Sequence, residues 1–413
     1  MIHKKTDILI LGAGIGGYET FRTLNREIKK HGLHKKMTLV DQNNYFTFTP
    51  MLHEVATGSV QPSHCAIPLR ELVYKTPHEF WKARVVSIFP EKKCVETSEG
   101  TLNYEYCVIA LGSKPNYFGV KGAQQYSHHV RTLPAAMNLH QAFIRLLEDK
   151  DDHDHIDLVV VGGGATGVEV AGLFSYLVKH DISKLYPEKK VSMTLVQSGD
   201  RLVPSLPEKM QRIILTQLKK SGVKIMLNAR IDEVKRDSVV IARDKEKTVF
   251  PCQLVVWTAG FDSAAPEYLD AKYTEKNQVL VTETLNLAEH KTVFALGDIC
   301  TVRCHDQEIP FPKLGDLAHK QGMYVAKHIS RMLQGKKQPK RFVFHSYGVL
   351  IPVGDWFGVA QLAHVIIKGR FAWWLRRTVY LHFLPGFSRK IRIAFDWTLH
   401  HVGFRHIIDI DCQ

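Results

Sequence analysis

The 413-residue chain lacks the cysteine patterns of a small disulfide-bonded or zinc-binding domain. Its seven cysteines are an odd number, are widely scattered and form no Cys-x-x-Cys pair. We therefore expect no disulfide framework and no metal site, and a reducing compartment is favoured. The cysteines are Cys65, Cys94, Cys107, Cys252, Cys300, Cys304 and Cys412.

Long apolar runs are also missing. The longest uncharged apolar stretches, 342–354 and 378–388, are shorter than the roughly 20 residues that span a bilayer. The N-terminal residues lead directly into a strand-like run at 7–11, which leaves no room for a signal or transit peptide. We expect no transmembrane helix, and a mature chain that starts near Met1.

Acidic residues are in the minority, with 41 Asp and Glu against 55 Lys and Arg, and the formal net charge is +14. This balance suits nucleic acid, anionic lipid or a phosphorylated ligand and does not choose among them. Hydrophobic residues make up 45% and charged residues 23%, which excludes disordered, collagen-like and coiled-coil classes. At about 150 residues per domain, two or three globular domains are expected.

What the sequence does contain is a glycine-rich turn near the N-terminus. A strand-like run ends at Gly12, and Gly14 and Gly17 follow in GxGxxG spacing before a proline-free helical stretch. The next predicted strand ends at Asp41. In a dinucleotide-binding fold such glycines allow a tight turn and a close pyrophosphate, and the acid accepts a ribose hydroxyl.

The same pattern recurs at Gly162, Gly164 and Gly167, and the strand after it ends at Gln197. Two correctly flanked copies predict two nucleotides, a flavin dinucleotide and a nicotinamide dinucleotide. NAD users normally carry an acid where Gln197 stands, and Arg201 lies nearby, so the sequence predicts use of NADPH beside NADH.

Three further predicted strands end on Gly112, Gly260 and Asp298. Strand ends of this kind face ligand crevices in open α/β sheets, which makes these residues candidate cofactor contacts. Ordinary core strands with turn glycines would give the same pattern, and Asp298 would then cap a helix.

The C-terminal region is basic and aromatic. Between 366 and 406 one acid, Asp396, stands against eight basic residues: Lys368, Arg370, Arg376, Arg377, Arg389, Lys390, Arg392 and Arg405. One helical face gathers Phe371, Trp374, Leu375, Thr378, Val379, His382 and Phe383. We expect an amphipathic helix on anionic lipid. A helix packed on the nucleotide domains through arginine stems is the alternative, and no nucleic-acid motif accompanies the patch.

Several segments together resemble the type II NADH:quinone oxidoreductases, which belong to the two-dinucleotide-binding flavoproteins. They are 41–45 (DQNNY), 49–58 (TPMLHEVATG), 162–169 (GGGATGVE), 294–298 (FALGD) and 372–397. The resemblance covers nearly the whole chain. It implies an α/β fold with two Rossmann-like domains plus a C-terminal membrane-associating module. The implied parts are FAD-binding 1–121 and 288–340, NAD(P)H-binding 122–287 and the module 341–413.

The resemblance also implies a function. FAD would occupy the first turn and NADH or NADPH the second, and two electrons would reach a membrane quinone without proton pumping. The protein would lie peripherally on the cytoplasmic face of the cell (inner) membrane, and a homodimer is left open. Glu169 would face the nicotinamide and flavin edge, Pro50 and Met51 would line the flavin ring, and Asp298 would meet its ribityl or phosphate side. A helix-dipole role is the alternative for Glu169.

The family pattern AQxAxQQG corresponds here to 315–322 (GDLAHKQG). Ala318 and Gln321 fit the pattern and are assigned to the flavin and quinone region, whereas Asp316 and Lys320 replace two glutamines. We predict that Asp316 and Lys320 hydrogen-bond the quinone and supply protons. Spaced four apart on a predicted helix, they would alternatively pair with each other.

Other functions remain open at this point. A disulfide reductase is disfavoured because 43–63 contains no cysteine. A sulfide:quinone oxidoreductase would use cysteines such as Cys300 and Cys304 at the flavin. A non-quinone acceptor and a redox-inactive nucleotide-binding protein are further alternatives, and a quinone is favoured because the C-terminal module would have little purpose for a soluble acceptor.

Overall fold

The computed structural model describes residues 2–149, 154–244, 246–302, 314–346, 348–384, 386–399, 405 and 407. Cys304, Cys412 and the side chain of Asp396 lie outside this description. The chain forms two compact units. Unit 1 comprises Met1–Phe48, Ala66–Lys114 and Asp262–Ser346, and unit 2 comprises Thr49–Cys65, Pro115–Phe261 and Tyr347–Gln413.

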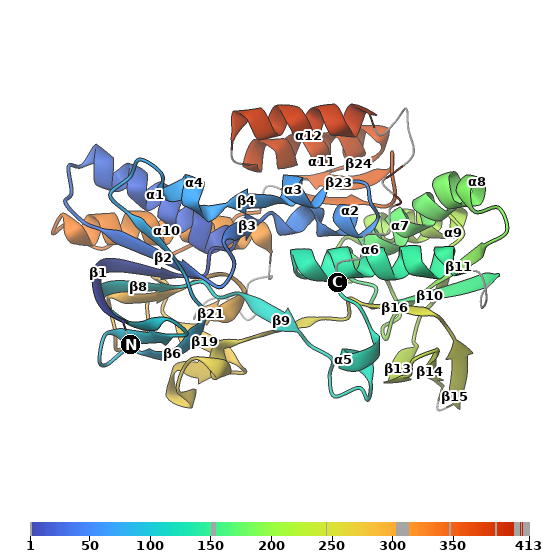
Figure 1. Cartoon of the computed structure of the whole chain (residues 1–413), viewed down its shortest axis with the longest axis horizontal. Helices are drawn as coiled ribbons and strands as arrows, with labels where there is room; N and C mark the ends of the chain where they lie inside the picture. Colours follow the sequence, from blue (N-terminus) through green and yellow to red (C-terminus); the bar gives the residue numbers. More distant parts are fainter. Residues whose placement is uncertain are drawn as a thin grey trace. The chain divides into compact units, whose positions relative to one another are not determined.

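Unit 1 is built on a parallel sheet with an antiparallel extension (Figure 1). Ile8, Leu9, Ile10 and Leu11 of β1 are all fully buried, as expected for a strand covered on both faces. The parallel order is β5 (Glu79–Lys82), β2 (Met37–Asp41), β1 (Ile2–Leu11), β8 (Gly100–Ile109) and β20 (Val293–Ala295). The first part of β8 pairs antiparallel with β7 (Cys94–Thr97), which pairs with β6 (Val85–Phe89).

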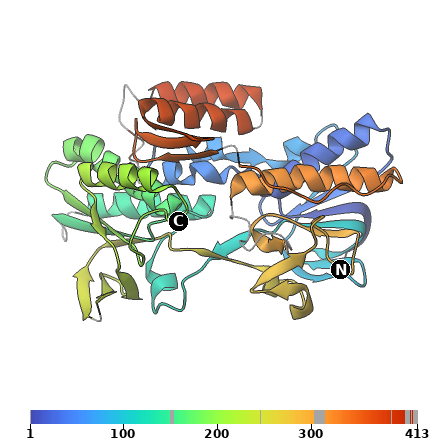
Figure 2. The same ribbon diagram turned by 180° about the vertical axis from the view of Figure 1, so that it is seen from behind.

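Two helices of unit 1, α1 (Ile15–Lys30) and α10 (Gly315–Leu333), lie side by side (Figures 1 and 2). A Cβ built on Gly322 would stand 2.6 Å from the Gly16 carbonyl oxygen, so glycine lets the two helices approach closely. The smaller elements are β3 (Tyr45–Thr47), β4 (Ala66–Pro68), α4 (Leu69–Val73), β18 (Thr274–Glu275), β19 (Gln278–Val281), β21 (Cys300–Val302) and the 3-10 helices Ala265–Glu267, Ala271–Tyr273 and Gly297–Ile299.

Unit 2 repeats the strand-turn-helix plan. Its four-stranded parallel sheet has the order β12 (Lys224–Met226), β11 (Lys190–Val196), β10 (His155–Val161) and β16 (Leu254–Trp257). Before the C-terminal part, its longer helices are α6 (Leu133–Glu148), α7 (Ala165–Leu177) and α9 (Glu208–Lys220). An antiparallel sheet of β13 (Arg230–Val234), β14 (Ser238–Arg243) and β15 (Glu246–Pro251) follows. The short helices are 3-10 Thr49–Met51, α2 (Leu52–Ala56), α3 (Pro62–Cys65), α5 (Ala123–Tyr126), π Val178–Ile182 and α8 (Ser183–Leu185). Separately, β9 (Ser113–Pro115) pairs with β17 (Phe261–Ser263).

The C-terminal part of unit 2 is an antiparallel sheet with two helices, drawn in red in Figure 1. The sheet consists of β22 (Gly348–Pro352), β23 (Gly358–Leu362) and β24 (Val365–Gly369), and the helices are α11 (Arg370–Phe383) and α12 (Phe387–Leu399). The helix predicted around 371–383 is confirmed. Within the described residues, no helix has the length and apolar character needed to cross a membrane.

The two compact units group several segments differently from the predicted domain boundaries, and residues 347–413 fall within unit 2. Residues 262–287 belong to unit 1, because β19 pairs with β21 and the Ser263 hydroxyl donates to the Ile299 carbonyl oxygen. Residues 49–65 belong to unit 2, where α2 packs against α6 and α7.

Candidate functional site

The first glycine turn has the shape of a phosphate cradle. Gly12 has φ +90°, and a Cβ built there would lie 2.4 Å from the Ala110 carbonyl oxygen. A Cβ on Gly17 would lie 1.9 Å from the Gly12 carbonyl oxygen. Beside Gly14, by contrast, no described heavy atom comes within 4 Å of such a Cβ. Protein thus fills the space at Gly12 and Gly17, and a ligand is free to occupy the space at Gly14.

Gly14 also caps α1, and it has no side chain to bond the first N–H groups of that helix. Free N–H groups and the helix dipole favour an anion at this position. The geometry therefore fits the pyrophosphate of FAD, as the sequence predicts.

Asp41 lies beside this cradle. Its carboxylate accepts hydrogen bonds from the backbone N–H groups of Ala13 (2.7 Å) and Asn43 (2.8 Å). Burial raises the pKa of Asp41, and these hydrogen bonds oppose the rise. The acid thus supports the turn as well as being placed to accept a ribose hydroxyl, a role that stays a prediction.

The second turn repeats this geometry. Gly162 has φ +105°, a Cβ on Gly167 would lie 1.9 Å from the Gly162 carbonyl oxygen, and the described structure leaves the space beside Gly164 open to 4 Å. Gln197 takes the place of Asp41, because its Oε1 accepts the Gly163 N–H at 2.8 Å. The amide keeps the supporting contact without a negative charge.

A cavity of about 540 Å³ opens at this second turn. Its volume suits the adenosine part of a dinucleotide. Its lining includes Gly162, Gln197, Ser198, Arg230, Asp232 and Trp257. Sequence reasoning missed Arg230, because it lies at the start of β13 in no recognisable motif and only the fold brings it to the cavity.

Arg201 has a different partner from the one predicted. Its guanidinium binds both carboxylate oxygens of Asp200, at 2.9 and 2.7 Å, and the pair is exposed. This ion pair reduces the charge that Arg201 has available for a phosphate. Arg230 is the cationic side chain in the cavity lining.

Of the other predicted strand-end residues, Gly112 and Gly260 lie in loops and Asp298 lies in the 3-10 helix Gly297–Ile299. Gly112 has φ +72°, and Gly260 has φ +158° and accepts the Asn116 N–H at 3.1 Å. The carboxylate of Asp298 accepts the Ser113 hydroxyl at 2.9 Å. The alternative that Asp298 caps a helix is wrong, because Leu296 is the cap residue of the short helix that contains Asp298.

Gln321 and Ala318 support the same region of unit 1. Gln321 is 1% exposed, and its Oε1 accepts the Gly297 N–H at 2.7 Å, next to Asp298. The backbone carbonyl of Ala318 lies 3.3 Å from a Cβ built on Gly16. Gln321 therefore holds the Gly297 turn, and a direct catalytic role for it stays a prediction.

Asp316 and Lys320 form the ion pair that the alternative interpretation predicts, with 3.0 Å between Oδ2 and Nζ. Lys320 also donates to the His345 carbonyl oxygen and lies 5.1 Å from the centre of the Phe344 ring. Both side chains are partly exposed, so the pair stays accessible to a small molecule.

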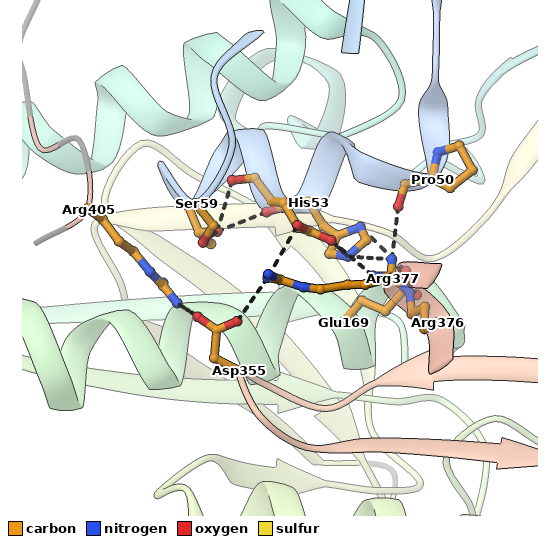
Figure 3. A network of polar contacts seen from close by, with 10 residues as sticks. Pro50, His53, Ser59, Glu169, Asp355, Arg376, Arg377 and Arg405 are labelled. Atoms are coloured by element: carbon orange, nitrogen blue, oxygen red, sulfur yellow. Dashed lines mark hydrogen bonds and ion pairs between the residues drawn. The ribbon is translucent and has the colours of Figure 1, made fainter. Parts of the chain in front are cut away.

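Unit 2 contains a buried polar network that joins α2, α7 and α11 (Figure 3). Arg376 donates to Glu54 Oε1 (2.9 Å), to the Pro50 carbonyl oxygen (3.0 Å) and to His53 Nε2 (3.0 Å). Glu169 closes the network, with 3.9 Å from Oε1 to Arg376 Nη2 and 3.7 Å from Oε2 to His53 Nδ1.

Glu169 is the predicted catalytic acid, and 15% of its side chain is exposed. Burial raises its pKa to about 7, Arg376 opposes the rise, and the Glu54 carboxylate adds to it. A carboxyl group with a pKa near neutrality is suited to both accepting and donating a proton. A role of Glu169 beyond the helix dipole stays a prediction.

Arg377 extends the network. Its Nη2 lies 3.8 Å from Glu54 and 3.5 Å from Asp355, and its guanidinium is 3.7 Å from the centre of the Trp373 ring. Asp355 in turn pairs with Arg405. The charges of Arg376 and Arg377 are therefore paired with acids inside the protein.

This burial corrects one prediction about the C-terminal region. Arg376, Arg377 and Arg405 were counted among the charges offered to lipid, but their exposed fractions are 3%, 5% and 7%. They pair instead with Glu54 and Asp355. No sequence pattern points directly to His53 or Asp355, although His53 and Glu54 lie in the 49–58 segment that carries the family resemblance.

Pro50 and Met51 lie beside this network in unit 2, at the start of the same segment. The Pro50 carbonyl is bound by Arg376, and Met51 is fully buried. Their predicted place at a flavin ring stays a prediction.

The fold and the two cradles define a nucleotide-dependent oxidoreductase, and the chain belongs to the pyridine nucleotide-disulphide oxidoreductase family, whose match spans residues 6–322. It is 25% identical to a probable NADH dehydrogenase of Dictyostelium discoideum over 411 residues, which cover 94% of this chain and 88% of the relative. It is also 25% identical to a type II NADH:quinone oxidoreductase of Staphylococcus aureus over 386 residues, covering 92% and 95%.

Solved structures show the same fold. NDH2 from Plasmodium falciparum in complex with NADH superposes with a TM-score of 0.89 at 20% identity, covering 98% of this chain and 99% of the other. The sulfide:quinone oxidoreductase of Aquifex aeolicus superposes with a TM-score of 0.77 at 19% identity, covering 97% and 96%.

Proposed function

We propose that the protein is an FAD-dependent NADH:quinone oxidoreductase that works at a membrane surface. The observation that carries this proposal is the pair of cradles, open at Gly14 and Gly164 and supported by Asp41 and Gln197. The similarity to NADH dehydrogenases spans more than nine-tenths of the chain, and the family match over residues 6–322 includes both cradles.

The chain's own residues hold and orient the cofactors. The first N–H groups of α1 and the open space beside Gly14 would hold the FAD pyrophosphate, and the cavity at Gln197 would hold the adenosine of NADH. Bound FAD supplies the two-electron chemistry between NADH and the quinone. Glu169 holds a proton at its carboxylate, and quinone reduction consumes protons.

The direct test is the absorption spectrum of the purified protein. We expect a flavin spectrum that NADH bleaches and that a water-soluble quinone restores. Sulfide is the matched alternative donor, and bleaching by sulfide but not by NADH would favour the sulfide:quinone oxidoreductase. Such an enzyme would use cysteines such as Cys300, whose Sγ here contacts the Gly297 carbonyl oxygen at 3.6 Å. A spectrum bleached by NADH that no quinone restores would indicate a different acceptor, and protein that binds no flavin would reject the proposal.

For the quinone we propose the Asp316–Lys320 pair as the binding element, because a partly exposed ion pair offers both a donor and a titratable acid. Asp316→Asn and Lys320→Gln should each lower kcat/KM for quinone about tenfold, with NADH-driven flavin bleaching unchanged. Unchanged quinone kinetics in both variants would remove the pair from the site.

Membrane attachment is proposed for α11 and α12. α11 buries Arg376 and Arg377 and exposes apolar side chains. This arrangement is the reverse of that expected for a helix that faces water, which exposes its charged residues and buries its apolar ones. The exposed large apolar residues of the two helices are Phe371 (66%), Trp374 (44%), Phe383 (43%), Ile391 (54%) and Phe395 (62%). Exposed Arg370 and Arg392 lie on the same two helices and would meet anionic headgroups.

We propose that this surface binds peripherally to the cytoplasmic face of the cell membrane. A homodimer is a separate proposal. Phe371→Ser with Trp374→Ser should release the protein from anionic phosphatidylglycerol vesicles, and high salt should weaken attachment of the wild type. Tyr74→Ser, which changes an aromatic residue of unit 1 that is 70% exposed, is the control. A double variant that still sediments with the vesicles would reject this surface.

A further inference from the structure

His53 lies between two charged groups of opposite sign. It stands on α2 and is 3% exposed. Its Nε2 is 3.0 Å from Arg376 Nη2, and its Nδ1 is 3.7 Å from Glu169 Oε2 (Figure 3).

The contact with Arg376 fixes the tautomer of this histidine. A guanidinium group has only donors, so His53 Nε2 must present its lone pair to Arg376. The proton of the neutral ring is then on Nδ1, which is the nitrogen that faces Glu169. Burial, Arg376 and Arg377 all lower the pKa of His53, so the ring stays neutral around pH 7.

Charged and titratable groups face His53 and Glu169 from each of the elements packed around them. Glu54 on α2 lies 3.9 Å from His53 Nε2, Arg376 and Tyr380 on α11 face Glu169, and Asp355 acts on His53 from between β22 and β23. Arg376 and His53 each offer a hydrogen to the Glu169 carboxylate within 4 Å.

We propose that His53 is a positioning residue for Glu169, held by Arg376 as the Nδ1–H tautomer so that it orients and stabilises the Glu169 carboxylate. This inference rests on the proposed function, in which Glu169 holds a proton during turnover. It extends that function to a residue outside both glycine turns. The separation of 3.7 Å between His53 Nδ1 and Glu169 Oε2 is longer than a hydrogen bond, and a small side-chain rotation would bring the two atoms to hydrogen-bond length, as at catalytic groups when substrate binds.

The proposal has a definite electrostatic consequence. A donor to the carboxylate favours its charged form, so loss of Nδ1–H should raise the pKa of Glu169. We expect His53→Phe to shift the midpoint upward by about one pH unit, a tenfold change in the ratio of protonated to ionised Glu169. His53→Asn places an amide N–H close to the position of Nδ1 and should restore most of the shift.

The test uses the flavin-loaded full-length protein and two readouts. Infrared difference spectra against pH follow the protonated carboxyl band that Glu169→Gln removes, and this readout needs no turnover. The pH profile of kcat/KM with NADH and a water-soluble quinone is the second. His78→Gln is the control, because His78 is also buried (5% exposed) but bonds Asn25 and the Met37 N–H in unit 1.

The outcomes separate this inference from the proposed function. An infrared midpoint that is the same in wild type and His53→Phe, or His53→Asn behaving like His53→Phe, would overturn the role of His53. If His53→Phe does not fold, nitrogen-15 NMR of histidine-labelled wild type decides, since a proton on Nε2 of His53 contradicts the proposal and a proton on Nδ1 supports it. Unchanged turnover in Glu169→Gln would reject the catalytic role of Glu169 in the proposed function, while the infrared shift still tests the His53 contact.

Discussion

Glu19 and Glu169 occupy the same place in two copies of one local structure. Each lies two residues after the last glycine of its turn, Gly17 or Gly167, on the first part of the following helix. The backbone of the two turns is alike, down to the 1.9 Å separation that forbids a side chain at either glycine. The two carboxylates nevertheless have different surroundings.

Glu19 is surrounded by partners from its own helix. Its carboxylate binds Arg22 (2.7 Å) and the Thr23 hydroxyl (2.5 Å), Arg26 lies 3.7 Å away, and His319 of α10 lies 3.5 Å away. Its side chain is 3% exposed. These contacts hold Glu19 as a buried, ion-paired structural carboxylate.

Glu169 has its partners on other elements. Arg376 comes from α11 and His53 from α2, and both lie farther from Glu169 than Arg22 and Thr23 lie from Glu19. The nearby Glu54 carboxylate and burial act against its charge. The same motif thus gives a structural acid in one unit and a titratable acid in the other, because the motif specifies the backbone and the neighbours specify the chemistry.

The largest expected effect is a loss of stability on removing Arg376, the arginine that lies near Glu169. Arg376→Leu leaves the buried Glu54 without its close partner and should lower the free energy of unfolding by about 3–5 kcal/mol. Urea denaturation measures this loss. Arg370→Leu, at the exposed start of the same helix, is the control and should change stability by less than about 0.5 kcal/mol. Equal losses in the two variants would show that Glu54 does not depend on Arg376.

Glu19→Gln should cause the next largest loss of stability. The change removes a buried carboxylate that accepts several hydrogen bonds, and we expect a loss of about 2–3 kcal/mol at pH 7. Glu27→Gln on the same helix, which loses only a contact with His31, should cost less than about 0.5 kcal/mol. A stable Glu19→Gln would mean that the two glutamates are less different than their contacts indicate.

Glu169→Gln should change stability in the opposite direction. Because the folded state raises the pKa of Glu169 to about 7 from the ordinary value of 4.5, the unfolded chain releases this proton at lower pH than the folded protein does. Stability of the wild type should therefore fall as pH rises from about 4.5 to 7. The glutamine variant should be more stable than wild type by about 1–2 kcal/mol at pH 8 and by little at pH 5. Denaturation at both pH values tests the sign, and a variant less stable at pH 8 would contradict the raised pKa.

The smallest expected effect concerns the second cradle. Gln197→Glu gives it a negative charge, as Asp41 gives the first, and this charge would repel the 2′-phosphate of NADPH. We expect kcat/KM for NADPH relative to NADH to fall about tenfold, or about 1.4 kcal/mol. A wild type that prefers NADH by more than roughly a hundredfold, about 2.7 kcal/mol, would contradict the prediction of NADPH use. Arg230→Gln and Arg201→Gln, measured in parallel, show which arginine acts on the phosphate.

Much of the fold was predictable because its signals are local. The two turns, the strands that lead into them, the partners Asp41 and Gln197 and the helix at 370–383 each follow from residues within one short segment. The positions of Arg230 and His53 were not predictable, because each contributes through an element distant in sequence. The pairing of Arg201 with its neighbour Asp200 was missed for another reason, since nothing in the sequence chooses between a phosphate and an adjacent acid.

The two dinucleotide cradles, the family and the amphipathic pattern of α11 can all be read from the order of residues alone. This is so because glycine conformation and side-chain periodicity are properties of consecutive residues. Only the tertiary structure decided that α11 buries Arg376 and Arg377 against Glu54 and Asp355, and that Glu169 titrates near neutrality. The physical reason is that a pKa and a buried ion pair depend on desolvation and on charges brought together through space, and neither is recorded in the order of residues along one segment.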